Sequence, residues 1–140
     1  MPELAPYSRI APLLDFRLGR FAAVGVSNTC IGLSVIFACK AWLGLGDVAS
    51  NATGYGVALL LGFALNRQWT FEHRGKPSTA FLRYLLVLAL SYAANLATTL
   101  GAIHILHLDS YVAQAFGIVP YALAGYLGAR LFAFASPLRR

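Results

Sequence analysis

The chain has 140 residues, of which 59% are hydrophobic and only 11% are charged, and its net charge is +6. Water-soluble domains carry about 25% charged residues, so this chain has too little polar surface to fold as a soluble globule of its size. A basic chain can bind nucleic acid, but here the basic residues stand beside long apolar runs, where lipid headgroups would surround them. The composition therefore predicts an integral membrane protein with no nucleic-acid partner.

The first element in chain order is a short helix within residues 1–19. Apolar residues recur there at helical spacing, with the charged residues elsewhere on the helical wheel. They are Ile10, Leu13, Leu14 and Leu18, followed by Phe21. Such a helix would lie in the membrane interface ahead of the first span, and the alternative is a frayed tail. We expect no cleaved signal peptide, because no apolar core leads to a small-residue cleavage site.

Four stretches without an acidic or basic side chain follow, at residues 21–39, 48–66, 84–103 and 110–129. Each is about 20 residues long, which at about 1.5 Å per helical residue matches a hydrocarbon core of about 30 Å. One such stretch could be a buried core helix, but four in so short a chain cannot all be covered by protein. We expect one all-α integral membrane domain over residues 1–140, with four transmembrane helices at about 21–43, 48–66, 84–104 and 111–130.

Polar residues inside the predicted spans form two faces. Asn28 stands beside Thr29 in the first span, and Asn95 shares a helical face with Ser91 and Thr99 in the third. An amide at this depth needs hydrogen-bonding partners, because an unpaired polar group in hydrocarbon is costly. The two faces either hold neighbouring helices together or line a polar groove that leads inward from the arginines.

Small residues recur every four positions in the second and third spans, which predicts close approach of helix backbones in lipid. They are Gly54, Ala58 and Gly62, and Ala93, Ala97 and Gly101. We interpret these stripes as packing surfaces.

The basic residues set the predicted orientation. All of them except Lys40 fall on one side if the four spans alternate in direction. They are Arg9, Arg17, Arg20, Arg67, Arg74, Lys76, Arg83, Arg130, Arg139 and Arg140. Because loops rich in Lys and Arg stay in the cytoplasm, we expect a multi-pass protein of the cytoplasmic (inner) membrane, with both termini and the 67–83 loop on the cytoplasmic side.

A shift of 63 residues superposes the two halves of the chain, since Arg20 falls on Arg83 (83 − 20 = 63) and Arg67 on Arg130. The other matches pair Gly54 with Gly117, Gly62 with Gly125, Phe21 with Tyr84, Trp69 with Phe132 and Phe71 with Phe134. The pattern predicts two copies of one helical hairpin, arranged as parallel repeats about an axis along the membrane normal. The alternative is chance similarity between apolar segments.

The carboxylates stand at or outside the predicted membrane boundaries. They are Glu3, Asp15, Asp47, Glu72 and Asp109. A small multidrug exporter, the natural four-helix rival, needs a carboxylate inside a span, and these arginines would repel its cationic substrates. No paired carboxylates and no pairing of a nucleophile with a base indicate catalysis. Neither the pair His104 and His107 nor the pair Cys30 and Cys39 makes a metal site. We expect no enzyme activity, no metal and no cofactor.

Three motifs carry a family resemblance. They are RFAAVGVSNT at residues 20–29, FALNRQWTF at 63–71 and FLRYLL at 81–86. In a chain with four predicted spans they resemble the GtrA-like family over about residues 18–135. The resemblance implies a four-span protein that moves polyprenyl-phosphate-linked sugars across the membrane to build cell-surface polysaccharide, or that assists the glycosyltransferases that make or use them. Ala129 stands where the first repeat has Asn66, so the two hairpins cannot supply identical sites.

The resemblance gives the polar and aromatic residues near the cytoplasmic boundary a candidate role. Guanidinium groups pair with phosphate oxygens in a bidentate manner, so we expect four arginines to hold the carrier phosphate, with Arg67 contributing most. They are Arg20, Arg67, Arg83 and Arg130. Asn66 would hold an arginine or a sugar hydroxyl, and Trp69 and Phe71 would lie against the prenyl tail or the sugar. Asn28, Tyr84 and Asn95 complete the candidate site. The alternative is a positive-inside anchor with an aromatic belt.

Two functions follow as hypotheses. The first is translocation of a polyprenyl-phosphate-linked sugar by a homo-oligomer, since four helices alone enclose little room for a glycosylated phosphate. The second is a non-transporting membrane subunit that anchors or stabilises a polyprenyl-phosphate glycosyltransferase, with the 67–83 loop as its docking surface. In both, the expected partners are membrane lipids, the carrier-linked sugar and a glycosyltransferase.

Overall fold

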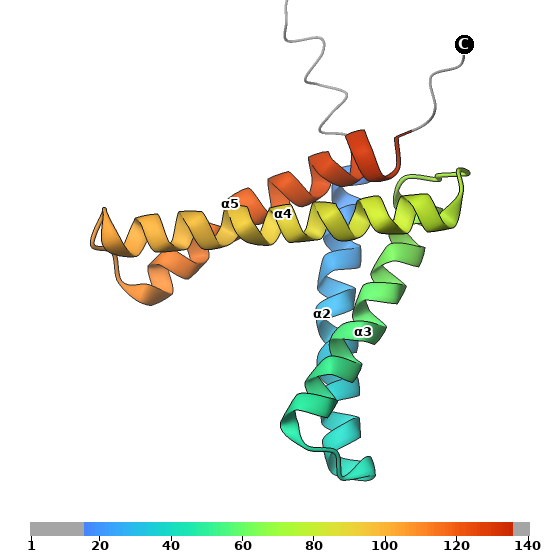
Figure 1. Ribbon diagram of the computed structural model, residues 1–140, viewed down its shortest axis with the longest axis horizontal. Coiled ribbons are helices and arrows are strands. Elements are labelled where there is room, and N and C mark those ends of the chain that lie inside the picture. Colours follow the sequence, from blue (N-terminus) through green and yellow to red (C-terminus); the bar gives the residue numbers. More distant parts are fainter. Residues whose placement is uncertain (1–15, 136–140) are drawn as a thin grey trace, which may run out of the picture. The chain divides into compact units, whose positions relative to one another are not determined.

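The computed structural model describes residues 16–135, and every regular element in that range is helical. Four long helices follow one another: α2 (Phe16–Leu43), α3 (Asp47–Leu65), α4 (Pro77–His104) and α5 (Ser110–Gly128) (Figure 1). A π-helical turn continues α3 as η2 (Asn66–Thr70) and another continues α5 as η3 (Ala129–Ala133). All four helices are long and apolar enough to cross a membrane. The prediction of an all-α membrane protein with four long apolar helices is confirmed.

Two of the helices begin before the predicted spans. α2 begins at Phe16, so residues 16–19 belong to the first long helix, and the rest of the predicted interfacial helix lies outside the described residues. α4 begins at Pro77, well before the span expected from residue 84. Proline suits this first helical position, because its fixed φ is helical and the N–H it lacks would have no intrahelical partner.

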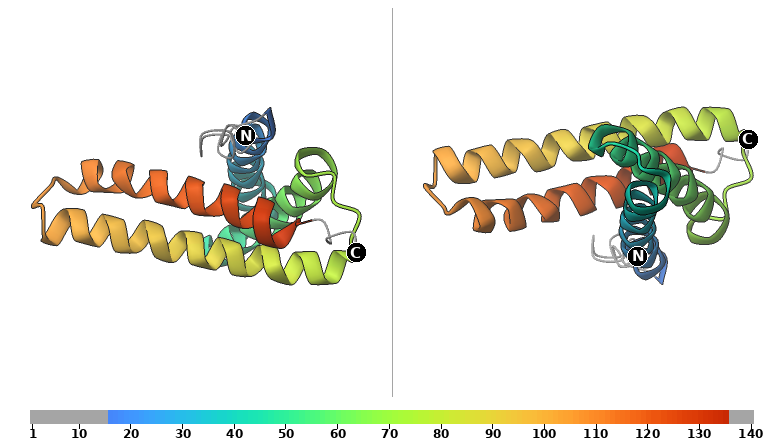
Figure 2. Two further views of the ribbon diagram at one scale, coloured as in Figure 1. Left: turned by 90° about the horizontal axis from the view of Figure 1, so that it is seen from above. Right: turned by 90° about the horizontal axis from the view of Figure 1, so that it is seen from below.

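The chain divides into two compact units, and the boundary falls between Glu72 and His73. In the first, α2 and α3 lie side by side and η2 continues α3 (Figure 1). In the second, α4 and α5 lie side by side, as both views in Figure 2 show. Each unit is one helical hairpin. We call them hairpin 1 (residues 16–72) and hairpin 2 (residues 73–135).

The two hairpins correspond element by element. α3 begins at Asp47 and α5 at Ser110 (110 − 47 = 63), and the π turns begin at Asn66 and Ala129 (129 − 66 = 63). α2 and α4 each have 28 residues, and α3 and α5 each have 19. The offset equals that of the sequence match. The arrangement of the hairpins as parallel repeats about a membrane axis stays a prediction.

Two glycines let α2 and α3 approach closely in hairpin 1. A β-carbon at Gly54 would lie 2.7 Å from the backbone oxygen of Gly32 and would overlap the Ile36 side chain. A β-carbon at Gly62 would overlap the side-chain amide of Asn28. The small residues of the second span therefore form a packing surface, as such stripes do in membranes.

Filling the space at Gly54 should open hairpin 1. We expect Gly54→Leu to lower the melting temperature of the detergent-purified protein by roughly 3–10 °C, because overpacking costs about 1–3 kcal/mol. Gly56→Leu is the matched control, since it adds the same atoms to the same helix where a β-carbon would meet nothing within 4 Å. Equal shifts for the two variants in a thermal-denaturation assay would contradict close packing at Gly54.

In hairpin 2, α4 and α5 meet at a glycine and at polar side chains. A β-carbon at Gly117 would lie 3.0 Å from Asn95 Nδ2 and would overlap the Thr99 hydroxyl. That hydroxyl donates to Ala113 O at 3.5 Å, from α4 to α5. At Gly101, by contrast, a β-carbon would meet nothing within 4 Å. The stripe expected in the third span therefore makes no close contact at this end.

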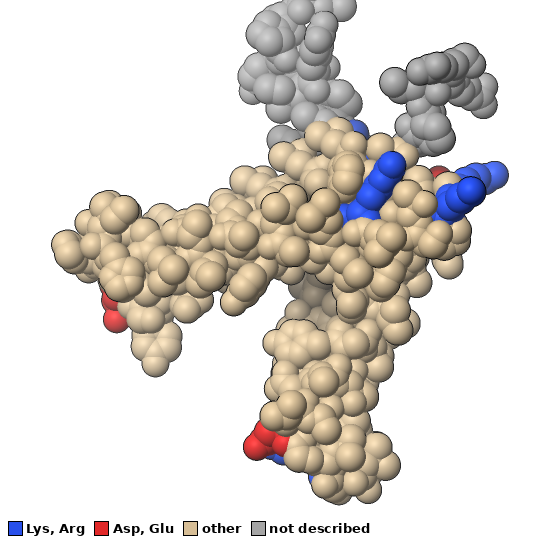
Figure 3. Space-filling model, in the orientation of Figure 1, with Lys and Arg blue, Asp and Glu red and all other residues tan. Residues whose placement is uncertain are grey.

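The middle parts of the hairpins present apolar surface. Only between 11% and 28% of each apolar window is buried. Side chains such as Leu60, Leu90 and Phe116 are more than half exposed. On the face drawn in Figure 3, charged atoms gather near the hairpin ends and leave the long middle parts bare of charge. Apolar surface of this extent is unsuited to water and suited to lipid. The chain is a multi-pass membrane protein.

Candidate functional site

Each hairpin ends in a π turn that carries an arginine and aromatic residues. The backbone N–H of Phe71 donates to Asn66 O at 2.9 Å, and that of Phe134 donates to Ala129 O at 2.8 Å. These bonds span five residues, whereas α-helical bonds span four, so each turn accommodates one extra residue. The side chains after the turn are thereby rotated relative to the helix that precedes it. Such turns occur often at functional sites.

Asn66 is engaged within its own turn. Its side chain is 2% exposed, and its Oδ1 accepts a hydrogen bond of 3.0 Å from the buried Thr70 hydroxyl. Residues four apart lie on one helical face, so this pair braces the π turn. The structure places the Asn66 side chain inside hairpin 1, and the expected role of this amide in holding an arginine or a sugar hydroxyl stays a prediction. Ala129 and Ala133 occupy the corresponding positions of hairpin 2.

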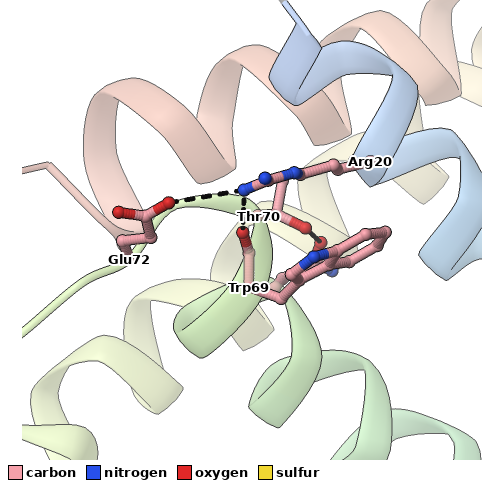
Figure 4. Close-up of polar contacts among 5 residues, drawn as sticks. Arg20, Trp69, Thr70 and Glu72 are labelled. Atoms are coloured by element: carbon pink, nitrogen blue, oxygen red, sulfur yellow. Dashed lines mark hydrogen bonds and ion pairs between the residues drawn. The ribbon is translucent and has the colours of Figure 1, made fainter.

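Arg20 joins the start of α2 to the π turn of hairpin 1 (Figure 4). Its Nη1 donates to Trp69 O at 2.8 Å and to Glu72 Oε1 at 3.3 Å. The guanidinium lies 5.2 Å from the centroid of the Trp69 ring and 4.7 Å from that of Phe16. Charge-assisted hydrogen bonds and cation–π contacts are both attractive for a guanidinium at a partly exposed site. Arg20 therefore has an anionic partner and two aromatic partners within its own hairpin.

Arg83 repeats the stacking but lacks the carboxylate. Its guanidinium lies 5.3 Å from the centroid of the Phe132 ring, much as Arg20 lies by Trp69. The position that corresponds to Glu72 is Ala135 (135 − 72 = 63). Within residues 16–135 no carboxylate forms an ion pair with Arg83, and its side chain is exposed.

The aromatic residue that directly follows each π turn packs inward. Phe71 is 7% exposed and its ring centroid lies 6.2 Å from that of Phe21. Tyr84 and Phe134 are also buried, with centroids 5.6 Å apart. Phe71 is thus part of the core of hairpin 1 and Tyr84 part of the core of hairpin 2, and contact of either ring with a carrier stays a prediction. Trp69, at 45% exposure, keeps an accessible ring.

A cleft of about 400 Å³ opens in hairpin 2 beside Arg83. Its lining consists of His73, Gly75, Lys76, Thr79, Ala80, Arg83, Ala133 and Ala135. The volume lies within the range of small-ligand sites, about 300–1,000 Å³. Lys76 is the N-cap of α4, so Lys76, Thr79 and Arg83 recur along one helical face. The sequence predicts a loop over residues 67–83, whereas the structure begins α4 within that range at Pro77, a residue type that signals a helix start.

His73 stands at the edge of this cleft. Its Nδ1 lies 3.2 Å from Phe134 O, and because a carbonyl oxygen only accepts, Nδ1 is the donor. Its ring also meets the Phe134 ring edge-on at 5.8 Å. These contacts fix the imidazole beside Lys76 and Arg83.

Comparison with known families shows which family the chain belongs to. The family described as GtrA/DPMS, transmembrane domain, matches residues 20–134. The chain belongs to the GtrA/DPMS family. The matched range begins at Arg20 and ends at Phe134, which are parts of the arginine–aromatic clusters of hairpins 1 and 2. A comparison with curated proteins finds no match. Membership of the GtrA/DPMS family indicates a role in handling lipid-linked sugars.

The two asparagines of this GtrA/DPMS domain lie at helix contacts of their own hairpins. Asn28 meets Gly62, and Asn95 meets Gly117. Asn28 Oδ1 is buried and accepts no hydrogen bond from residues 16–135. The placement favours the packing role that the sequence left open for both amides. A polar groove shared by the two faces stays a prediction.

The other two candidate arginines of the GtrA/DPMS domain, Arg67 and Arg130, are half-buried. Arg130 Nη1 donates to the Tyr126 hydroxyl at 2.7 Å, and its guanidinium lies 5.9 Å from the centroid of that ring. Arg67 lies within η2. Arg83 is more exposed than either and lines the cleft, so accessibility favours Arg83 over Arg67 as the leading phosphate ligand.

Proposed function

We propose that this GtrA/DPMS protein translocates a polyprenyl-phosphate-linked sugar across the cytoplasmic membrane, for the synthesis or modification of cell-surface polysaccharide. The observation that carries the proposal is the cationic cleft of hairpin 2, which opens at the end of a long apolar hairpin. We further propose that the protein performs no chemical step, works as a homo-oligomer, and receives its substrate from a polyprenyl-phosphate glycosyltransferase.

The chemistry of the carrier fits this arrangement. A polyprenyl-phosphate sugar has an anionic head at the membrane interface and an isoprenoid tail in the bilayer. Lys76 and Arg83 supply positive charge to the cleft. Leu86 and Leu90 follow Arg83 along α4 and are exposed, so the same helix offers the tail an apolar surface. An anion near several cations in a region less polar than water is bound more strongly than at an open aqueous surface.

Transport by the purified protein in liposomes tests the proposal. Vesicles would carry a polyprenyl-phosphate-linked glucose in the inner leaflet, and an impermeant glycosidase outside would report its arrival. We expect glucose release to be faster with the protein than in protein-free vesicles. Equal rates would favour the alternative, a non-transporting subunit, and that alternative predicts that a glycosyltransferase co-purifies with the chain through the segment between η2 and α4.

We also predict the orientation of the hairpins. In a background without Cys30 and Cys39, single cysteines at Ser78 and Gly46 should react with an impermeant thiol reagent from opposite sides of the membrane. Ser78 is exposed in the first turn of α4, and a side chain at Gly46 would meet no neighbour within 4 Å, so both substitutions leave packing intact. The excess of Lys and Arg predicts that Ser78→Cys is labelled from the cytoplasm. Labelling of both cysteines from outside intact cells would contradict this topology.

A further inference from the structure

The two hairpins present the same arginine in two electrostatic states. Arg20 and Arg83 correspond in sequence, and each stacks on the aromatic residue at the fourth position of the π turn in its hairpin. Arg20 has the carboxylate of Glu72 at 3.3 Å. Arg83 has Ala135 at the corresponding position and no ion pair within residues 16–135. The charge of Arg20 is thus neutralised within hairpin 1, whereas the charge of Arg83 is left to be neutralised from outside hairpin 2.

The surroundings of Arg83 reinforce this difference. The cleft brings Lys76 to the same space, and among the described residues no carboxylate lines it. Thr79 adds a hydroxyl, and the His73 ring stands at the edge with Nδ1 directed to Phe134 O. Two permanent cations and a hydroxyl around about 400 Å³ match a phosphate group, whose oxygens accept several charge-assisted hydrogen bonds. Ala133 and Ala135 add only small, uncharged side chains to the lining.

We propose that the hairpin 2 cleft is the phosphate site of the protein, and that Glu72 occupies the corresponding position of hairpin 1 so that the chain presents one such site. The inference deepens the proposed function and rests on it for the identity of the ligand as a lipid-borne phosphate. It replaces four arginines led by Arg67 with one accessible arginine, Arg83, supported by Lys76. Arg20 then serves hairpin 1 as a structural link, and Arg67 lies outside the cleft.

The decisive variants copy the hairpin 1 carboxylate into hairpin 2. Ala135→Glu should place an acid near Arg83 and lower the affinity for a phosphate at least tenfold, while Ala135→Gln, of equal size and without charge, should stay within about twofold of the parent. Binding of a short-chain isoprenyl phosphate would be measured by calorimetry on the full chain in detergent. The isoprenol without the phosphate is the ligand control. Equal affinities for the two Ala135 variants would overturn the proposal.

Arginine variants locate the site independently. Arg83→Gln should weaken binding of the isoprenyl phosphate about tenfold or more, since hydrogen bonds to charged groups are strong. Arg67→Gln and Arg20→Gln should change it by less than threefold. A loss for Arg67→Gln equal to or greater than that for Arg83→Gln would overturn the assignment and return it to η2. Unchanged elution on size exclusion would establish that each compared variant is folded.

Competition separates a lipid headgroup from free phosphate. Inorganic phosphate should compete with the isoprenyl phosphate only at concentrations at least a hundredfold higher, because it lacks the tail that contacts α4. Equal competition would overturn the lipid assignment. The binding assay involves no transport, so it tests the phosphate site separately. If the affinities change among the variants as expected but the parent protein fails to transport, translocation would be refuted and the phosphate site would stand. Conversely, if the parent protein transports the carrier but Ala135→Glu binds the isoprenyl phosphate as tightly as the parent does, the phosphate site would be refuted and translocation would stand.

Discussion

The double substitution Lys76→Gln and Arg83→Gln should reduce delivery of a polyprenyl-phosphate-linked sugar by about a hundredfold at sub-saturating carrier concentration. Each cation contributes a charge-assisted contact to the phosphate, and losing each should weaken binding about tenfold or more. At low carrier concentration the transport rate follows the occupancy of the site, so the affinity loss appears directly as a rate loss. The measurement is the initial rate of glycosidase-accessible glucose in proteoliposomes.

The matched control is Arg74→Gln. Arg74 is exposed, belongs to the same short segment before α4, and is absent from the cleft lining. The Arg74→Gln substitution removes a positive charge within a few residues of Lys76 and should lower the transport rate by less than threefold. A loss for Arg74→Gln as large as that for Lys76→Gln alone would mean that a diffuse positive surface attracts the carrier, as in a simple positive-inside anchor.

The second large effect is on stability and concerns Arg20. Arg20→Ala removes the hydrogen bond to Trp69 O, the ion pair with Glu72 and the stacking on two rings. The contacts with Trp69 and Glu72 link the start of α2 to η2 and the residues just after it, so hairpin 1 should open at that end. We expect a fall in melting temperature of roughly 5–10 °C, from a loss of about 2–3 kcal/mol.

Arg83→Ala is the internal comparison for this prediction. Arg83 makes the matching stacking contact with Phe132 but no ion pair within the described residues, so its loss should lower the melting temperature by less than about 3 °C. Thermal denaturation in detergent measures both variants. Equal shifts would show that the carboxylate of Glu72 and the carbonyl of Trp69 add nothing to hairpin 1. The two arginines should therefore have different roles, with Arg20 affecting stability and Arg83 affecting binding.

The helical fold was predictable from sequence because one physical constraint dominates it. A segment that crosses hydrocarbon must be apolar over about 20 residues, and uncharged stretches of that length appear four times. The first residue of each helix was less predictable, because the uncharged stretch that follows Arg83 does not show how far the helix extends on the N-terminal side of Arg83. α4 begins at Pro77, in the part of the helix that we expect outside the hydrocarbon core, where polar residues are tolerated. The proline itself carried that information.

The candidate site was predictable in its residue types and less so in its contacts. Arg20 and Trp69 stood out in the sequence, but their pairing across 49 residues depends on how the hairpin closes. Phe71 and Tyr84 looked like ligand contacts because aromatic residues near a membrane boundary often face the interface. The π turn instead directs Phe71 into the core. The Asn66–Thr70 bond follows a four-residue spacing that could have been recognised.

Native mass spectrometry of gently extracted protein tests most directly whether the chain holds a polyprenyl-phosphate carrier. The account predicts that the parent protein and Arg74→Gln carry a bound mass equal to a polyprenyl phosphate or its glycosylated form. The same mass should be missing from the Lys76→Gln and Arg83→Gln double variant at equal protein recovery. Finding only bulk phospholipid on the parent protein, or the carrier mass retained on the double variant, would contradict the account.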